Sequence, residues 1–114
     1  MNKLLISAFI GILFSGSTFA GVKIPMTDKF YQGKYFMLSN IKSKNINTVI
    51  YKSIFKEETI FSKMEINCSN RKYRKIGESI NSLDSLKEYT NKGTWITPVN
   101  GATHYDVVRF VCKK

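Results

Sequence analysis

The chain has 114 residues and a formal net charge of +10, from 18 lysines and arginines against 8 acidic residues. This length fits one small domain, which buries only somewhat more than about 60% of its unfolded surface. The sequence contains no glycine-rich phosphate loop, no paired acidic signature and no ligand cluster at metal spacing, and His104 is its single histidine. These features argue against an enzyme, and neither a cofactor nor a metal is predicted.

The first 20 residues have the parts of a secretory signal peptide. Lys3 precedes an apolar run of about 11 residues, and small residues lead to Ala20, so cleavage is expected before Gly21. The run is shorter than the roughly 20 residues that a membrane-spanning helix needs. Because position 21 is not the cysteine that lipoproteins acylate, no lipid anchor is expected. The sequence therefore predicts a signal peptide over 1–20 and one exported domain over 21–114, without a transmembrane helix, that is periplasmic, secreted or at the cell surface.

Cys68 and Cys112 are the only cysteines, and both lie in the part that is expected to be exported. An even number of cysteines in an oxidising compartment predicts a disulfide between them. The bond would close a loop of about 45 residues, and the chain-entropy description gives such a closure about 4 kcal/mol. This is a large part of the stability expected for so small a domain.

Two segments in the first half have the composition of β-strands. Residues 29–38 (KFYQGKYFML) are rich in aromatic residues, and Gly33 indicates a turn or bulge within them. Residues 45–55 (NINTVIYKSIF) are strongly β-forming, and Val49 and Tyr51 share one face. The second segment is expected to be a central strand.

Residues 61–80 are expected to form a β-hairpin. In the first half of this segment, Met64 and Ile66 alternate with charged and polar residues, which is the pattern of a strand with one buried face. Residues 69–72 (SNRK) have turn chemistry, and an extended pattern resumes at Tyr73.

The last third of the chain leaves alternatives open. Residues 81–91 fit either a short helix, capped by Ser82 and closed by Gly93, or a polar loop. Residues 103–112 (THYDVVRFVC) combine the T-x-x-D spacing of a helix capping box with a valine-rich composition that favours a strand. Trp95 is expected in the core.

Two stretches, KMEINCSNRKYRKIGES and WITPVNGATHYDVVRFVC, together with the spacing of their cysteines, resemble the surface-adhesin protein E family of Gram-negative bacteria. The resemblance covers roughly residues 61–112, about half of the expected mature chain. It implies an α+β fold, in which a small antiparallel sheet, curled like a half barrel, packs against a C-terminal helix. The disulfide between Cys68 and Cys112 would then tie this helix to the sheet.

The resemblance also implies a function. Members of the family bind host extracellular-matrix or serum proteins of the vitronectin and laminin type, and the family allows a homodimer. This chain differs from the family in lacking the lipid-attachment cysteine at its expected N-terminus. The implied role is a non-enzymatic adhesin, and the alternative is a periplasmic protein that binds polyanions or the cell envelope in an accessory role.

A basic cluster directly after the first cysteine is the candidate ligand-binding region. Without Lys3, 17 lysines and arginines remain against 8 acidic residues, a net charge of +9. Cations at a hairpin tip raise the local potential and steer an acidic protein segment, an acidic glycan or lipopolysaccharide, whereas solvated charges of this kind also protect an edge strand from pairing. The predicted ligand-binding residues are Lys63, Arg71, Lys72, Tyr73, Arg74 and Lys75.

Overall fold

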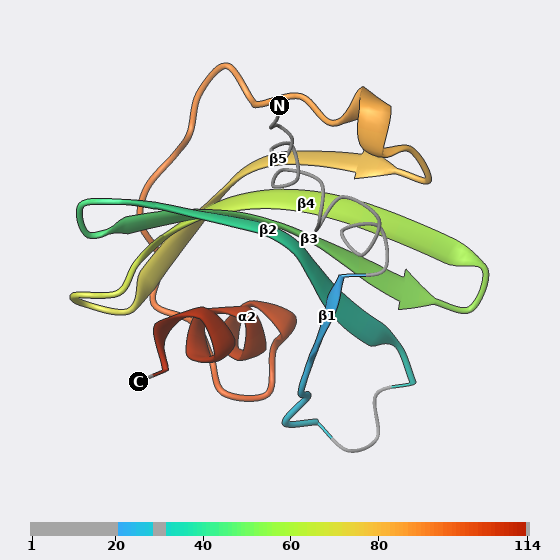
Figure 1. Ribbon diagram of the computed structural model, residues 1–114, viewed down its shortest axis with the longest axis horizontal. Helices are drawn as coiled ribbons and strands as arrows, with labels where there is room; N and C mark the ends of the chain where they lie inside the picture. Colours follow the sequence, from blue (N-terminus) through green and yellow to red (C-terminus); the bar gives the residue numbers. More distant parts are fainter. Residues whose placement is uncertain (1–20, 29–31, 114) are drawn as a thin grey trace, which may run out of the picture.

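The computed structural model describes residues 21–28 and 32–113. The predicted signal peptide and the start of the predicted first strand, residues 29–31, lie outside the described residues. Within them, the chain forms a five-stranded antiparallel sheet in the order β1-β2-β3-β4-β5 and one α-helix, which lies against the concave side of the sheet (Figure 1). The elements are β1 (Val22–Ile24), β2 (Lys34–Ser43), β3 (Ile46–Phe55), β4 (Glu58–Asn67), β5 (Lys72–Ile80), the 3-10 turn η3 (Leu83–Ser85) and α2 (Thr103–Cys112).

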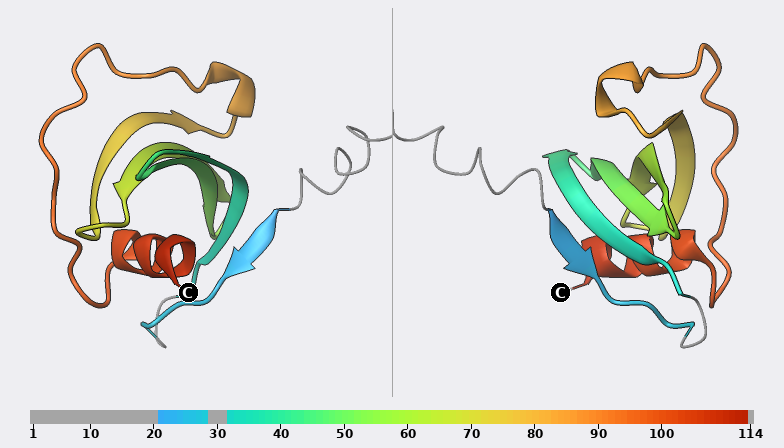
Figure 2. Two further views of the ribbon diagram at one scale, coloured as in Figure 1. Left: turned by 60° about the vertical axis from the view of Figure 1, so that its left-hand side comes forward. Right: turned by 90° about the vertical axis from the view of Figure 1, so that its right-hand side faces the viewer.

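This architecture confirms the predicted small α+β fold with an antiparallel sheet, a C-terminal helix and one disulfide. The sheet curls around α2, as both views in Figure 2 show. β4 and β5 form the predicted hairpin, with Ile66 opposite Tyr73. No helix in the described ranges is both long and apolar enough to cross a membrane.

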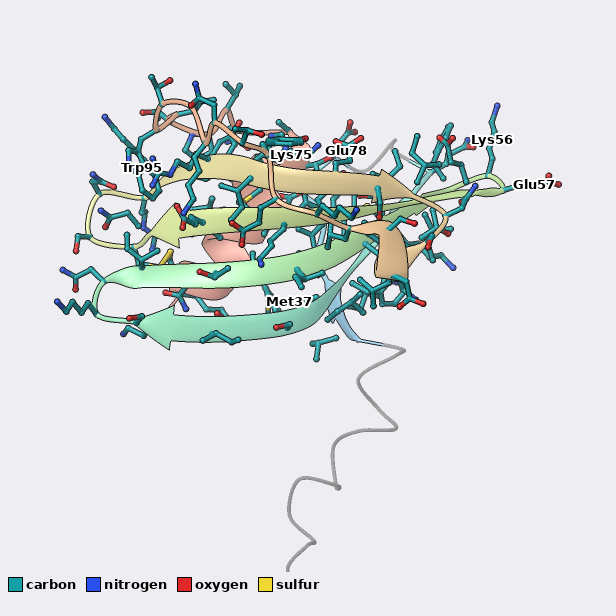
Figure 3. The ribbon with its side chains drawn as sticks, turned by 90° about the horizontal axis from the view of Figure 1, so that it is seen from above. Met37, Lys56, Glu57, Lys75, Glu78 and Trp95 are labelled. Atoms are coloured by element: carbon teal, nitrogen blue, oxygen red, sulfur yellow. A yellow bond between two sulfur atoms is a disulfide. The ribbon has the colours of Figure 1, made fainter. Side chains whose placement is uncertain are left out.

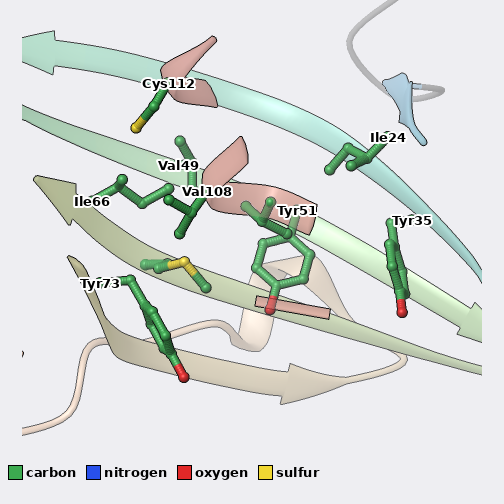
Figure 4. Close-up of a cluster of buried hydrophobic side chains, with 10 residues drawn as sticks. Ile24, Tyr35, Val49, Tyr51, Ile66, Tyr73, Val108 and Cys112 are labelled. Atoms are coloured by element: carbon green, nitrogen blue, oxygen red, sulfur yellow. The ribbon is translucent and has the colours of Figure 1, made fainter. Parts of the chain in front are cut away.

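The core lies between the concave face of the sheet and α2. The predicted alternation in β3 is confirmed, because Val49 and Tyr51 are buried while Ile50 between them is only partly covered. α2 completes the core with Val107 and Val108, which are buried against the sheet. This burial outweighs the strand preference of valine and decides the open question of residues 103–112 in favour of a helix. Figure 4 shows the cluster, which comprises Ile24, Tyr35, Val49, Tyr51, Met64, Ile66, Tyr73, Val107, Val108 and Cys112.

The disulfide joins the end of α2 to the turn after β4. Cys68 and Cys112 are bonded, and their Cα atoms lie 5.4 Å apart. The helix therefore cannot leave the sheet at this end without breaking a covalent bond.

The start of α2 does not use the predicted capping box. Ala102 is the N-cap, and no side chain caps the first turn. The Thr103 hydroxyl is instead 2.7 Å from the Tyr35 hydroxyl, and the Asp106 carboxylate accepts a bond from the Thr27 backbone N–H at 3.2 Å. Both polar groups thus serve tertiary contacts, which the local T-x-x-D pattern could not reveal.

Bulges occur in two strands, but not at Gly33. In β2 the register shifts between Met37 and Ser39, whereas Gly33 precedes the strand. In β5, Gly77 is opposite Lys63 while the next pair joins Lys75 to Met64, so the residue between them is extra. A bulge re-aims the side chains that follow it.

Residues 81–101, which we call the strap, are irregular apart from η3, so the polar-loop alternative was right. Besides two bonds within its own turn at residues 82–86, the backbone of the strap bonds to β5: Tyr89 N–H donates to the Ile76 carbonyl at 2.7 Å, and Tyr73 and Ile96 exchange two bonds of 3.0 and 2.8 Å. The strap therefore covers the outer edge of β5.

The strap approaches β5 closely at Gly77. A Cβ at Gly77 would lie 2.7 Å from the Lys87 carbonyl oxygen, so the approach of the strap to β5 requires glycine at this position.

Candidate functional site

The six predicted ligand-binding residues lie on one hairpin but not on one surface. Because opposite residues of an antiparallel pair share a face, Arg74 lies beside Glu65 on the convex side, while Tyr73 lies beside Ile66 in the core. Lys75 also faces the concave side, where it lines a pocket near the start of α2. The structure thus divides the cluster between two faces.

Most of the predicted cations already have partners. Lys63 forms an ion pair with Glu88 at 2.8 Å, and Lys75 forms one with Glu78. The Arg71 guanidinium donates to the Cys112 carbonyl at 3.3 Å, where it compensates for an unpaired carbonyl at the end of α2. These contacts hold the hairpin to the strap and to the helix, and they reduce the charge that the hairpin offers to another molecule.

Arg74 has the most contacts of the set. Its Nε lies 2.8 Å from the Glu65 carboxylate, and its guanidinium lies over the Trp95 ring, 4.4 Å from the ring centroid. Burial raises the pKa of Glu65, but hydrogen bonds from Arg74 and Lys92 outweigh it and lower that pKa below the ordinary value. The prediction that Trp95 belongs to the core is wrong, because its half-buried ring lies against Arg74 outside the core cluster (Figure 3).

Tyr73 is a core residue and not a surface contact. Its side chain is 8% exposed, and its ring centroid lies 4.6 Å from that of His104 at the start of α2. Burial raises the pKa of the Tyr73 hydroxyl. Burial also lowers the pKa of His104, with a further contribution from the nearby Lys75 ammonium. This pair joins β5 to the helix, so Tyr73, which was predicted among the ligand-binding residues, offers little surface to a ligand.

The β2–β3 turn, the β4–β5 turn and the end of α2 lie at one end of the molecule, on the left in Figure 1, and these segments carry a second group of cations, Lys42, Lys44 and Lys113. A groove of about 410 Å³, which we call the end groove, opens there. Within the described residues its lining contains no carboxylate. Asn47 is fixed at the base of the groove, since its amide donates to the Asn40 side-chain oxygen at 2.8 Å and the residue is 6% exposed. The lining residues are Lys42, Asn45, Asn47, Cys68, Ser69, Val111, Cys112 and Lys113.

Sequence reasoning missed the end groove because its residues come from three distant segments. The signal was nevertheless present: in an up-and-down antiparallel sheet, the turns after the second and fourth strands lie at the same end. Lys44 in the first turn and Lys72 after the second turn therefore lie at the same end of the sheet.

The concave face holds another polar pocket, of about 490 Å³, between the sheet and the start of α2. The buried Tyr51 and Ser62 lie at its base, and burial raises the pKa of the Tyr51 hydroxyl far above its ordinary value. The Lys75 and Glu78 ion pair lies at its wall (Figure 3). The described residues contain no group of three or more His, Cys, Asp or Glu side chains that could hold a metal ion.

Comparisons with known protein families, with curated proteins and with solved structures find no match to this chain. Membership of the surface-adhesin protein E family therefore remains a prediction from the two stretches that resemble it.

Proposed function

We propose that the protein is an exported, non-enzymatic binding protein whose partner presents an acidic surface, in the manner of the adhesins that its sequence resembles. A host extracellular-matrix or serum protein of the vitronectin or laminin type is the partner that this resemblance favours. The region that we assign to the partner is the end groove with the two adjoining turns, instead of the hairpin cluster around Arg74.

The separation of charge along the sheet carries this proposal. The cations of the hairpin are largely paired with carboxylates, whereas Lys42 and Lys44 have no ion pair among the described residues. Acidic residues occur instead at the opposite end, where Glu57 follows Lys56 in the β3–β4 turn and Glu58 begins β4 (Figure 3). A dipolar distribution of this kind orients an acidic partner toward one end of the molecule.

A second candidate function follows from the neutral side chains of the end groove. Asn45 and Ser69 supply hydrogen bonds beside the lysines, and this combination also suits the sulfates or phosphates of a glycan or of lipopolysaccharide. In that case the protein would be a periplasmic, polyanion-binding accessory protein.

Binding measured across a salt series distinguishes the two functions. The purified protein would be tested against immobilised vitronectin, laminin, heparin and lipopolysaccharide, in low salt and in about 0.5 M salt, where surface charges are strongly screened. An adhesin keeps its preference for one protein, whereas a polyanion-binding protein loses all four ligands together. Absence of binding to every ligand at low salt would exclude both functions.

Matched variants test the location of the binding region. The double variant Lys42→Ser with Lys44→Asn removes two charges at the end groove, and Lys56→Asn with Lys87→Ser removes two charges elsewhere. The first variant is expected to weaken binding at least about tenfold, while the second changes it little. Equal losses would mean that net charge, and not the end groove, determines binding. Protease treatment of intact cells then tells whether the protein reaches the surface.

A further inference from the structure

The sheet has one covered edge and one open edge. The strap bonds to β5 along its outer side, through Tyr89 and Ile96. On the other side, β1 pairs only with residues 35–37 of β2. No strand in the described part of the chain pairs with the outer side of β2 from residue 38 to residue 43.

The pairing between β1 and β2 ends at a defined point. The bulge after Met37 interrupts the register of β2, and Gly21, just before β1, has a φ of 75° that turns the backbone away from an extended path. A Cβ at Gly21 would lie 2.8 Å from the Met37 carbonyl oxygen, so this position requires glycine. Figure 3 shows β2 as the outer strand, with β1 beside the part near Met37 alone.

The open segment is long enough to bind an extended peptide. Six residues are close to the usual length of a β-strand, and an edge strand presents alternate N–H and C=O groups to an incoming chain. Asn40, Lys42 and Ser43 are exposed, and Ile41 is 66% exposed, so no other part of the described chain buries this end of the edge. Ile41 adds an apolar contact on one face of the edge.

The charge of this edge selects the occupant. β1 and β2 together contain Lys23, Lys34 and Lys42 and no acidic residue, and Lys44 follows directly in the turn. A second copy paired through the same edge would bring together two strands that carry lysines and no carboxylate, so the two edges would not complement each other in charge. An acidic strand would instead place carboxylates beside them.

We infer that the outer edge of β2, residues 38–43, binds an extended acidic segment of the partner as an additional β-strand. This inference rests on the proposed function, because it specifies how the acidic partner is held next to the end groove. The main-chain bonds supply the general affinity, and Lys42 and Lys44 select for acidic side chains.

Hydrogen exchange with a model peptide tests this mode of binding. The probe is a ten-residue peptide of alternating glutamate and valine, and the control has the same charge but proline in place of each valine. The alternating peptide is expected to slow amide exchange in residues 38–43 at least about tenfold, with no comparable change in β5. The proline peptide cannot form the ladder and should give no such protection.

Two outcomes would overturn the inference while the proposed function stands: equal binding of both peptides, or binding of vitronectin or another acidic ligand with no protection at this edge. Self-association of the free protein that protects the same amides would assign the edge to a second copy and would also overturn it. Failure to bind any acidic ligand in the salt series would instead remove the proposed function itself.

A pair of variants in equivalent turns provides the matched control. Lys44 and Lys56 each occupy the first position of a two-residue turn, with φ of 59° and 57°, at opposite ends of β3. Lys44→Glu is expected to weaken binding of the alternating peptide at least about tenfold, whereas Lys56→Glu should change it less than about twofold. Similar effects of the two variants would mean that the edge has no part in selecting the peptide, which contradicts the inference.

Discussion

The ring of Tyr73 in β5 packs against the ring of His104 in the first turn of α2, with centroids 4.6 Å apart. The contact joins β5, the last strand of the sheet, to the helix that covers the core. It also places the only histidine where burial disfavours its charged form, beside Lys75. The stability of the helix docking is therefore linked to pH.

We expect the free energy of unfolding to decrease as the pH falls from about 7 to about 5. Burial first, and then the Lys75 charge, lower the pKa of His104 below its ordinary value of 6.5, so the unfolded chain binds the proton more readily than the folded one. The contribution of neutral His104 to stability is fully present above pH 6.5, and it is lost as the pH falls toward the pKa of His104 in the folded protein. Urea unfolding at several pH values measures it, and His104→Phe, which keeps a ring on Tyr73, should flatten the dependence. An unchanged slope in His104→Phe would refute the assignment. The lowered pKa of Glu65 acts in the same direction but in the range below its ordinary value of 4.5.

Removal of the disulfide is expected to destabilise the protein by about 4 kcal/mol, because the bond between Cys68 and Cys112 closes a long loop. The double variant Cys68→Ser with Cys112→Ser should show this loss in urea unfolding, together with a weaker helical signal in circular dichroism. Adding a reductant to the wild type should reproduce the loss, and the double variant should not respond to it. A response of the variant to reductant would point to a different cause.

Glycine in the two-residue turns should stabilise the sheet. Lys44 and Lys56 have positive φ at a position where hairpin turns favour glycine, and a side chain there costs about 1 kcal/mol or more. Lys44→Gly and Lys56→Gly should each raise the free energy of unfolding by roughly 0.5 to 1 kcal/mol. Alanine at either position should give no such gain, since it keeps the Cβ. Only Lys44→Gly should also weaken binding of acidic ligands, so the two readouts separate stability from function.

Gly77→Ala is expected to destabilise the protein by about 1 to 3 kcal/mol, because the new methyl group would lie 2.7 Å from the Lys87 carbonyl oxygen and would push the strap away from β5. Gly93→Ala is a suitable comparison, as no atom lies within 4 Å of the added Cβ and only the positive φ opposes the change. Amide exchange at Tyr89 reports on the strap directly. It should accelerate in Gly77→Ala and remain slow in Gly93→Ala; the reverse order would show that the close approach does not fix the strap.

Local patterns predicted the parts of the fold that depend on alternation. Val49, Tyr51, Met64 and Ile66 are buried as their two-residue period required, and the pairing of the only two cysteines was correct. Tyr73 could have been placed as well, because a four-residue turn after Asn67 sets it opposite Ile66. The length of a turn fixes which residues of the two strands are opposite each other, and this pairing decides on which face of the sheet each side chain lies.

Local sequence patterns predicted the candidate site less well than the fold. A run of cations in the sequence suggested one surface, but its charges are neutralised by Glu65, Glu78 and Glu88, which come from other parts of the chain or across a bulge. Trp95 was misplaced for the same reason, because its partner Arg74 belongs to a different segment. Lys75 and Glu78 are three residues apart, but the pairs of Lys63 with Glu88 and of Arg74 with Trp95 join distant segments, and no short window of sequence contains them.

The position of the disulfide has a further consequence for survival outside the cell, where we propose that the protein acts. Cys68 precedes the strap and Cys112 follows it, and most of the strap is exposed. A protease that cuts within residues 81–101 would therefore produce two polypeptides that remain covalently joined. In gel electrophoresis the nicked molecule would migrate as a single species until the disulfide is reduced. The open edge of β2 and the end groove lie outside the cut segment and would remain in place.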